Sequence, residues 1–430
     1  MAGETAKSGR GCAVVFESDL DLWLQRVVPG GASGERCAAV SLDNGDAIHY
    51  FLRNPPELPP HRGEPLVGLA VFSPQAAASP SQDFDRWRSV LPPGRPVGQL
   101  LQVSGSRQDG SLRLQSWSLR GHEWIQDKIM LVPPSERAFA RNEGILESGL
   151  LAEREVVIVG LGSGGAPIAI ELAKAGVGRF VLVDQDCIEI ENVGRHPCGV
   201  WDLGRRKTLA LRDRILEKNP HATCRLLDGD VVEREGEFRS LIAESHMLVG
   251  ATDNNRSRRL INRLAIELGK PAVFGRAYQR ACGGDVIRYR PGGPCYECLF
   301  GKGAVEEEVS SKRSRQMPAY ADVPARVEPG LSVDIAPISL FCARLVIQEL
   351  VLGTDSSLRS LEDDLVGSLF LWANRREGQF SAWQPMGHSF KRMAVQRWYC
   401  LNAPREPKCP ACNEDAFLRG LEEELQSPLP

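Results

Sequence analysis

A glycine cluster follows a short apolar run near the middle of the chain. Its members are Gly160, Gly162, Ser163, Gly164 and Gly165. The apolar run is Val156–Val159, and a helical pattern, Ala166–Ala175, comes next. Glycines permit a tight turn and let backbone amides approach a phosphate, which the positive end of a helix also attracts. A second apolar run, Val181–Val183, ends at Asp184, about 20 residues on, where an acid holds ribose hydroxyls in such units. The pattern predicts a nucleotide-binding β-α-β unit, although a lone glycine cluster also fits a simple tight turn.

Polar side chains beyond Asp184 favour a triphosphate as the ligand. They are Asp186, Asn192, Arg195 and Lys207. The cations among them lie within reach of a triphosphate, whereas a dinucleotide has no need of them. Further on, the apolar run Met247–Gly250 leads to Thr252–Asn254. A carboxylate at the end of such a strand is suited to hold magnesium beside the phosphates. The pattern predicts an ATP site with magnesium at Asp253.

Two pairs of cysteines have the spacing of metal-binding knuckles. One pair is Cys295 and Cys298, and the other is Cys409 and Cys412. Four thiolates satisfy a tetrahedral structural zinc, which needs no open coordination position. The pairs are about 110 residues apart, farther than in a zinc finger, so the tertiary fold has to bring them together. Redox-active or unrelated cysteines are the alternative.

With these motifs, the chain resembles the ThiF/MoeB family, which includes the activating enzymes of ubiquitin-like proteins. The resemblance covers roughly residues 137–415. It implies a Rossmann-like α/β adenylation domain with a structural zinc, which uses ATP and magnesium to adenylate the C-terminal glycine of a small β-grasp protein. The matching positions are the glycine loop Gly160–Gly165, the ribose acid Asp184, Asn192 and Arg195 of an Asn-x-x-Arg motif, Lys207, and Thr252, Asp253 and Asn254. Ser163 departs from the usual Gly-Gly pair, but a small residue still admits backbone approach to a phosphate.

The resemblance also implies how these residues act. Asp253 would hold magnesium, Lys207 and Arg195 the phosphates, and Asn192 the α-phosphate or the ribose. In the family, an arginine-rich segment before the first strand reaches into the partner subunit's ATP site. Arg141 matches that segment, so we expect a homodimer. A solvated arginine on a helix is the alternative for Arg141.

The segment after the first cysteine pair carries no thiol. The charged stretch Glu306–Arg315 would be a crossover loop that guides the cargo tail, and a solvated loop is an equal alternative. Family members that carry cargo as a thioester place a cysteine in this loop, yet Tyr320–Leu331 has none. Three explanations stand. The reaction stops at adenylation, another cysteine acts, or Ala325 stands at a position that has been substituted.

Other cysteines are weaker candidates for the thioester. Cys198 and Cys282 are each predicted to lie in a loop, and Cys187 lies beside Asp184 in the sequence. We interpret Cys342, within the predicted apolar helix Ile338–Leu352, as a buried small hydrophobe.

The chain length predicts more than one domain. At 430 residues the expectation is two to three, and we assign residues 131–430 to the adenylation domain and 1–130 to an accessory α+β domain. Proline-rich segments at Pro55–Pro65 and Ser79–Pro96 are predicted loops of the accessory domain. Its predicted strands are Cys12–Phe16, Ala38–Leu42, Ala47–Leu52, Val67–Phe72 and Leu112–Leu119.

One stretch of the accessory domain faintly resembles the JAMM isopeptidase motif, in which two histidines precede a proline and an aspartate follows. Leu69–Pro74 and Ser79–Asp83 carry the likeness. Val71 and Ser73 stand at the histidine positions, so a zinc hydrolase cannot be assembled. The resemblance implies a degenerate, JAMM-like binding platform.

Composition limits the classes of partner and the cellular location that we expect. The formal net charge of -3 and pI near 6.2 give no general argument for nucleic acid. The sequence has no apolar run of about 18 residues, so we expect no membrane span. The N-terminus lacks a hydrophobic signal core. The 12 cysteines suit a reducing cytoplasm better than a disulfide framework, so we expect a cytoplasmic protein.

Two classes of function follow. The first is an adenylyltransferase that activates a ubiquitin-like protein for thioester transfer to a conjugating-enzyme partner, or a sulfur-carrier protein as in MoeB and ThiF. Bacterial members with an added N-terminal domain often occur in ubiquitin-like conjugation operons, some of them antiviral. The second is a nucleotide-binding dehydrogenase or an inactive nucleotide-binding scaffold. Lys207, Arg195 and Asp253 favour the first class, since hydride transfer needs none of them.

Overall fold

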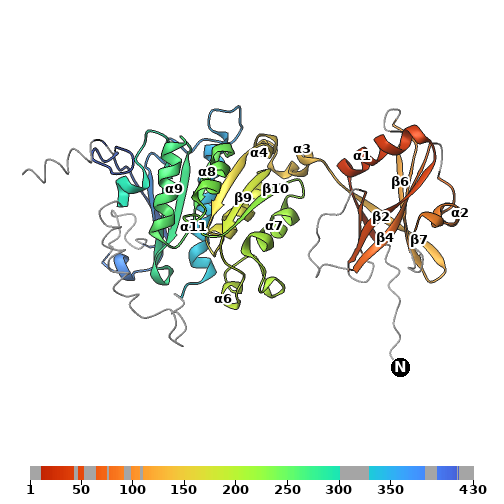
Figure 1. The fold of residues 1–430 in the computed structure, drawn as a ribbon, viewed down its shortest axis with the longest axis horizontal. Helices are drawn as coiled ribbons and strands as arrows, with labels where there is room; N and C mark the ends of the chain where they lie inside the picture. The colour runs from red at the N-terminus through yellow and green to blue at the C-terminus, as the bar shows by residue number, and fades with distance from the viewer. Residues whose placement is uncertain are drawn as a thin grey trace, which may run out of the picture. The chain divides into compact units, whose positions relative to one another are not determined.

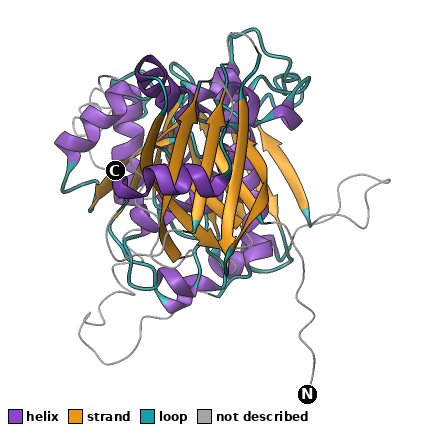
Figure 2. Cartoon of the chain, turned by 90° about the vertical axis from the view of Figure 1, so that its right-hand side faces the viewer, coloured by secondary structure: helices purple, strands orange, loops and turns teal. Residues whose placement is uncertain are grey.

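The chain folds into two compact units, Met1–Ala138 and Phe139–Pro430. In both units, short β-branched runs provide strands and amphipathic stretches provide helices. A computed structural model describes residues 11–42, 47–52, 64–74, 77–91, 98–106, 110–300, 329–382, 395–413 and 415. Figure 1 draws the chain as a ribbon and Figure 2 separates its strands from its helices by colour. None of the helices in this described part is long and apolar enough to cross a membrane.

The first unit is a closed barrel of seven strands in the order β1-β3-β2-β4-β5-β6-β7. The barrel closes because β1 pairs in parallel with both β3 and β7. Its strands are β1 (Cys12–Phe16), β2 (Ser33–Leu42), β3 (Ala47–Phe51), β4 (Glu64–Ser73), β5 (Gln99–Ser104), β6 (Arg113–Arg120) and β7 (Glu123–Val132). Its helical segments are α1 (Glu17–Val27), η1 (Val28–Gly30), α2 (Pro80–Trp87), η3 (Arg88–Val90) and α3 (Ser135–Ala138).

Several elements of the barrel differ from the sequence prediction. The segment Ser79–Pro96 was predicted as a loop, but it contains α2. Pro80 occupies the first turn of α2, where a missing amide costs nothing, and Ser79 forms a capping box with Gln82. The prediction also missed α1, β5 and β7. The apolar spacing of α1 was present in the sequence, because Leu20, Trp23, Leu24 and Val27 fall on one helical face and are buried.

The second unit is built on an eight-stranded sheet in the order β10-β9-β8-β11-β12-β13-β14-β15. The strands from β10 to β12 are parallel, and β13 to β15 are antiparallel. The strands are β8 (Glu155–Val159), β9 (Arg179–Asp184), β10 (Thr223–Asp228), β11 (Met247–Gly250), β12 (Ala272–Ala277), β13 (Gly283–Tyr289), β14 (Leu369–Ala373) and β15 (Arg397–Leu401). The chain leaves β8 toward β9 on one side and returns to β11 on the other, which creates a topological switch point.

Helices cover both faces of this sheet (Figure 1). Alternate strand residues divide between two apolar clusters, because successive side chains of a strand point to opposite faces. Helices α5, α7 and α11 contribute to one cluster, and α8, α9 and the cysteine pairs contribute to the other. The helical segments are η4 (Ala140–Asn142), α4 (Ser148–Ala152), α5 (Gly165–Ala175), α6 (Ile190–Val193), η5 (Val200–Asp202), α7 (Lys207–Lys218), α8 (Glu235–Glu244), α9 (Asn255–Glu267), η6 (Gln279–Ala281), α11 (Ser332–Val351) and η7 (Gly378–Phe380).

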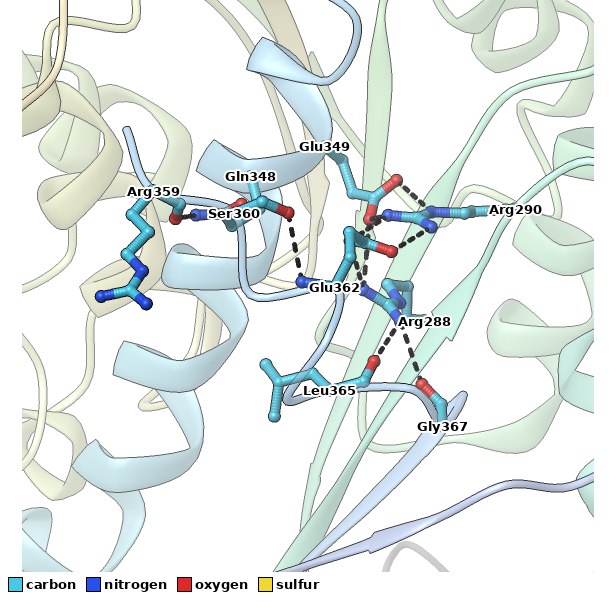
Figure 3. Close-up of polar contacts among 9 residues, drawn as sticks. All are labelled: Arg288, Arg290, Gln348, Glu349, Arg359, Ser360, Glu362, Leu365 and Gly367. Carbon is cyan, nitrogen blue, oxygen red and sulfur yellow. Dashed lines mark hydrogen bonds and ion pairs between the residues drawn. The ribbon is translucent and has the colours of Figure 1, made fainter. Parts of the chain in front are cut away.

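Polar contacts hold helix α11 near its C-terminus and, toward its N-terminus, at the glycine loop. Near its C-terminus, Glu349 accepts three hydrogen bonds from the Arg290 guanidinium, at 3.0, 2.8 and 2.6 Å, and Glu362 joins the same cluster (Figure 3). Arg288 donates to the carbonyl of Leu365 at 2.7 Å. Toward its N-terminus, the hydroxyl of Ser339 donates to the Gly164 carbonyl at 2.9 Å. The helix therefore spans from the antiparallel strands to the glycine loop. It begins at Ser332 rather than at the predicted Ile338, with Pro337 inside it.

Candidate nucleotide site

A cavity of about 350 Å³ lies at the carboxyl ends of the parallel strands, at the switch point. Most of the predicted nucleotide residues line it: Gly160, Gly162, Ser163, Gly164, Asp184, Asp186, Asn192, Arg195, Lys207, Thr252, Asp253 and Asn254. Gly165 and Arg141 are not in this lining. Gly165 is buried at the start of α5, and Arg141 is exposed in η4. The fold thus gathers twelve of the fourteen predicted positions around one space.

The glycines of the loop have two different roles. Gly160 has a φ of 86°, and a side chain on Gly165 would collide with the Gly160 carbonyl oxygen at 1.9 Å. These two glycines are required by the backbone itself. Gly162 and Gly164 have no atom within 4 Å of the position where a Cβ would lie, although both line the cavity. They therefore leave room for a ligand to approach the backbone and the N-terminus of α5.

Asp184 supports the glycine loop as well as facing the cavity. One carboxylate oxygen accepts a 2.6 Å hydrogen bond from the Leu161 amide, and the other accepts one of 2.8 Å from the Asp186 amide. Burial raises the pKa of the Asp184 carboxyl, while Lys207 and the two amides act in the opposite direction. Each carboxylate oxygen keeps further lone pairs, so the group can still accept from ribose hydroxyls.

Lys207 is a nearly buried cation at the start of α7. Its Nζ lies 2.8 Å from the Asp186 carboxylate and 3.9 Å from that of Asp184. Its side chain is only 9% exposed, so its charge is weakly screened inside the cavity. Such a cation attracts a phosphate more strongly than a lysine on the surface would.

His196, which the sequence analysis left without a role, links Arg195 to the glycine loop. One ring nitrogen, Nε2, lies 2.8 Å from the Leu161 carbonyl oxygen, and the other, Nδ1, accepts from the Cys198 amide at 3.0 Å. This pairing requires a neutral ring with its proton on Nε2. Burial lowers the pKa of His196, and the nearby Lys207 lowers it further.

The predicted magnesium segment forms the opposite wall of the cavity. Asp253 is exposed to the cavity space, and Asn254 caps α9 by accepting from the Ser257 amide at 2.9 Å. The Ser257 hydroxyl donates to the Thr252 hydroxyl at 2.7 Å. One carboxylate together with substrate phosphates is the usual ligand set of magnesium in nucleotide sites, so Asp253 fits that ion.

A second, smaller cavity of about 160 Å³ adjoins the first, since Ser163, Gly164 and Thr252–Asp253 line both. Its other lining residues include Arg258, Arg276 and apolar residues of α11. Arg276 is paired with the buried Asp285 at 2.6 Å. The Nε of Arg258 is buried and has no hydrogen-bond partner among the described residues.

The two cysteine pairs meet in the tertiary fold. The sulfur atoms of Cys295, Cys298, Cys409 and Cys412 all lie within 4.8 Å of one another. Cys295 and Cys409 are 3.6 Å apart, and Cys298 and Cys412 are 3.5 Å apart. These separations are too long for disulfides and close to those of thiolates around one zinc. Where the chain is described, this is the single cluster of metal-ligating side chains.

The structure argues against Cys198 and Cys282 as the cysteine that carries cargo as a thioester. Cys198 is only 1% exposed and Cys282 only 4%, so a thiol at either position is out of reach of a protein cargo. Burial raises the pKa of the Cys198 thiol to about 12, which disfavours the nucleophilic thiolate. Cys342 is fully buried in the core, as the sequence predicted. The segment Glu306–Arg315 and Ala325 lie outside the described residues.

Sequence reasoning missed part of the cavity wall. Gly229, Asp230 and Val231 follow β10, the neighbour of β9, and also line the cavity. A signal was available, because an apolar strand ends there at Asp228 and parallel strands present their carboxyl ends at one edge.

Comparison with known proteins identifies the family of the chain. A profile of the ThiF family matches residues 143–362, and the chain belongs to that family. The chain is 28% identical over 284 residues to the sulfur carrier protein adenylyltransferase of Thermus thermophilus, an alignment that covers 63% of this chain and 86% of the relative. It is 30% identical over 218 residues to the adenylyltransferase and sulfurtransferase uba4 of Emericella nidulans, across 49% of this chain but only 43% of that relative. A crystal structure of E. coli MccB with MccA-N7isoASN superposes with a TM-score of 0.44 at 19% identity, covering 62% of this chain and 69% of that one.

Proposed function

We propose that this chain uses ATP to adenylate the C-terminal carboxylate of a small ubiquitin-like, β-grasp protein. The observation that carries the proposal is the pair of adjoining cavities. One combines glycine-loop amides, Lys207, Arg195 and Asp253, which suit a nucleoside triphosphate. The other leads away from it along Arg258 and Arg276.

The reaction needs positioning and charge neutralisation more than proton transfer. An oxygen of the cargo carboxylate attacks the α-phosphorus of ATP. The bond from that phosphorus to the oxygen bridging to the β-phosphate breaks, and both electrons leave with pyrophosphate. The carboxylate is already ionised, so no general base is required. Lys207 and Arg195 would bind the phosphates, Asn192 the α-phosphate or the ribose, and Asp253 a magnesium ion that neutralises charge on the phosphates.

The second cavity would admit the cargo tail. Its cations favour a terminal carboxylate, and its volume of about 160 Å³ suits a narrow, glycine-like chain end better than bulky side chains.

The relatives favour a sulfur-carrier cargo at least as well as a conjugated modifier. Two of them carry sulfur-carrier or sulfurtransferase names. Adenylation is common to the activation of sulfur carriers and of conjugated modifiers, and it is the step that we propose. Transfer to a conjugating-enzyme partner, and a role in an antiviral conjugation pathway, belong to the conjugation branch.

The remaining parts of the chain complete the proposal. A homodimer would bring Arg141 of one protomer to the nucleotide site of the other. The four cysteines would bind a structural zinc, because their sulfur positions fit a tetrahedral ion. The N-terminal barrel would act as a degenerate, JAMM-like binding platform, in which the buried Val71 stands where that motif has a histidine.

Isotope exchange between ATP and pyrophosphate tests the proposal. A β-grasp protein with an exposed C-terminal glycine should support exchange, and one lacking that glycine should not. Asp253→Ala should lower exchange by about 100-fold or more. Asp355→Ala, which removes an exposed acid outside the cavity, is the matched control and should stay at the wild-type rate. Absence of exchange with sulfur carriers and modifiers alike, or full activity in Asp253→Ala, would contradict the proposal.

A further inference from the structure

The first cysteine knuckle is attached to helix α9 by several polar contacts. The buried side chain of Asn262 accepts a 3.0 Å hydrogen bond from the Tyr296 amide and contacts the Cys295 sulfur at 3.6 Å. Glu297 forms a 3.0 Å ion pair with Arg259. The knuckle therefore contacts α9 over much of its length.

One of these contacts continues to the nucleotide cavity. The Tyr296 hydroxyl donates to the side-chain oxygen of Asn255, the first residue of α9, at 3.0 Å. Arg258 donates to the same oxygen at 3.2 Å, and its other terminal nitrogen donates to the Thr252 carbonyl. Thr252 precedes Asp253 directly, and both line the cavity. A short chain of hydrogen bonds thus runs from the knuckle to the proposed magnesium segment.

The residues that form this series of hydrogen bonds are buried, so the series can transmit a displacement. Tyr296 is fully buried between Phe274 and Phe300, with ring centroids 5.3 and 5.5 Å away. Arg258 is 8% exposed. Buried hydrogen bonds between well-packed groups have few alternative partners, so displacement of Tyr296 is transmitted to Asn255 and Arg258.

We infer that Tyr296 is a positioning residue: the metal-binding knuckle uses it to hold the Thr252–Asn254 segment in the geometry that binds nucleotide. The inference rests on the proposed function for the identity of the ligand, ATP. The structural part of the inference, that the knuckle orders this segment, does not depend on any ligand. The cysteine cluster therefore does more than stabilise the unit, because it also sets the shape of the nucleotide cavity.

The test replaces Tyr296 by phenylalanine, which keeps the ring packing and removes only the hydroxyl. Glu297→Gln is the matched control, since it removes the charge from another contact between the same knuckle and the same helix. Three measurements are made on the full chain: zinc content, affinity for magnesium-ATP, and amide hydrogen exchange of residues 251–258 without nucleotide.

Tyr296→Phe should bind zinc at the wild-type stoichiometry yet exchange the amides of residues 251–258 faster. Its dissociation constant for magnesium-ATP should rise by about five-fold, the effect expected for one net hydrogen bond. In pyrophosphate exchange, KM for ATP should rise while kcat stays unchanged. Glu297→Gln should match the wild type in all of these.

Two results would overturn the inference. One is wild-type amide exchange and affinity in Tyr296→Phe, and the other is an equal change in Glu297→Gln, which would indicate general loosening of the knuckle. If the wild-type chain failed to bind ATP, the proposed function would be wrong, and the amide exchange comparison would still decide whether Tyr296 orders this segment.

Discussion

The Leu161 amide donates a 2.6 Å hydrogen bond to the Asp184 carboxylate, so the acid predicted to bind ribose also holds the glycine loop in place. The second oxygen of the same carboxylate accepts from the Asp186 amide. Loop geometry and the proposed binding of ribose therefore depend on one side chain.

Asp184→Asn should destabilise the second unit as well as weaken nucleotide binding. An asparagine has one acceptor oxygen for the two amides, so one donor would face the NH₂ group. The free energy of unfolding should fall by about 1–3 kcal/mol, the cost of an unsatisfied buried donor. Asp355→Asn is the control, because Asp355 is exposed outside the cavity, and it should cost less than about 0.5 kcal/mol. Urea unfolding measures both, and equal losses would contradict the dual role of Asp184.

His196 should make stability depend on pH below neutrality. Its pKa in the folded chain is lowered from the ordinary value of 6.5, so the unfolded chain takes up the proton first. The stabilising contribution is complete above pH 6.5 and is lost as the pH falls through the lower, folded-state pKa. Protonation also destroys the acceptor for the Cys198 amide.

Urea unfolding between pH 5 and 8 tests this expectation. Burial also lowers the pKa of His49 and His246, so the wild-type slope has several sources. Lys207, Asp184 and Asp202 surround His196 and contribute to its pKa. The informative quantity is the difference between wild type and His196→Gln, whose stability should fall less on acidification. Parallel curves for the two proteins would refute the role of His196.

The cysteine cluster should bind one zinc ion per chain. Removal of the metal by a chelator, or Cys298→Ser, should lower stability by at least about 2 kcal/mol, or roughly 4–8 °C in midpoint temperature for a unit of this size. Cys400→Ser is the control, because Cys400 is exposed on β15 outside the cluster. Metal analysis and thermal unfolding are the measurements. A chain without zinc but with wild-type stability would show that the thiols do not act as a structural metal site.

A bulky side chain at the second cavity should obstruct the cargo and spare the nucleotide. Ala277 lines that cavity, is exposed, and lies on β12, where an aromatic residue is well tolerated. Ala277→Tyr should raise KM for the cargo by about ten-fold or more, because the chain end can no longer enter, while the dissociation constant for ATP stays unchanged. Gln279→Tyr, which lies outside the lining, is the control. Loss of ATP affinity in Ala277→Tyr would instead place this cavity within the nucleotide site.

Local sequence was sufficient for the elements that carry the glycine loop. The strand β8 and the helix α5 were predicted because their apolar runs are continuous and the glycines between them are adjacent in the chain. Asp184 and Asp253 were predicted for a similar reason, since each lies at or just after the end of an apolar strand. Lys207 was predicted as a cation beyond Asp184 and from the family resemblance. The α2 helix was missed because its prolines and serines were interpreted as loop residues rather than as a helix start.

The sequence by itself determined the nucleotide-binding unit and the two cysteine pairs, because residues close together in the chain encode them. Only the tertiary structure decided which distant groups meet. Ser339 reaches the Gly164 carbonyl across 175 positions of sequence, and Cys295 meets Cys409 across 114. Tyr296 likewise reaches Asn255, 41 positions away, and Cys198 is buried although its sequence suggested a loop. Packing of helices on both faces of the sheet sets these contacts, and no periodicity within a single segment encodes which faces will come together.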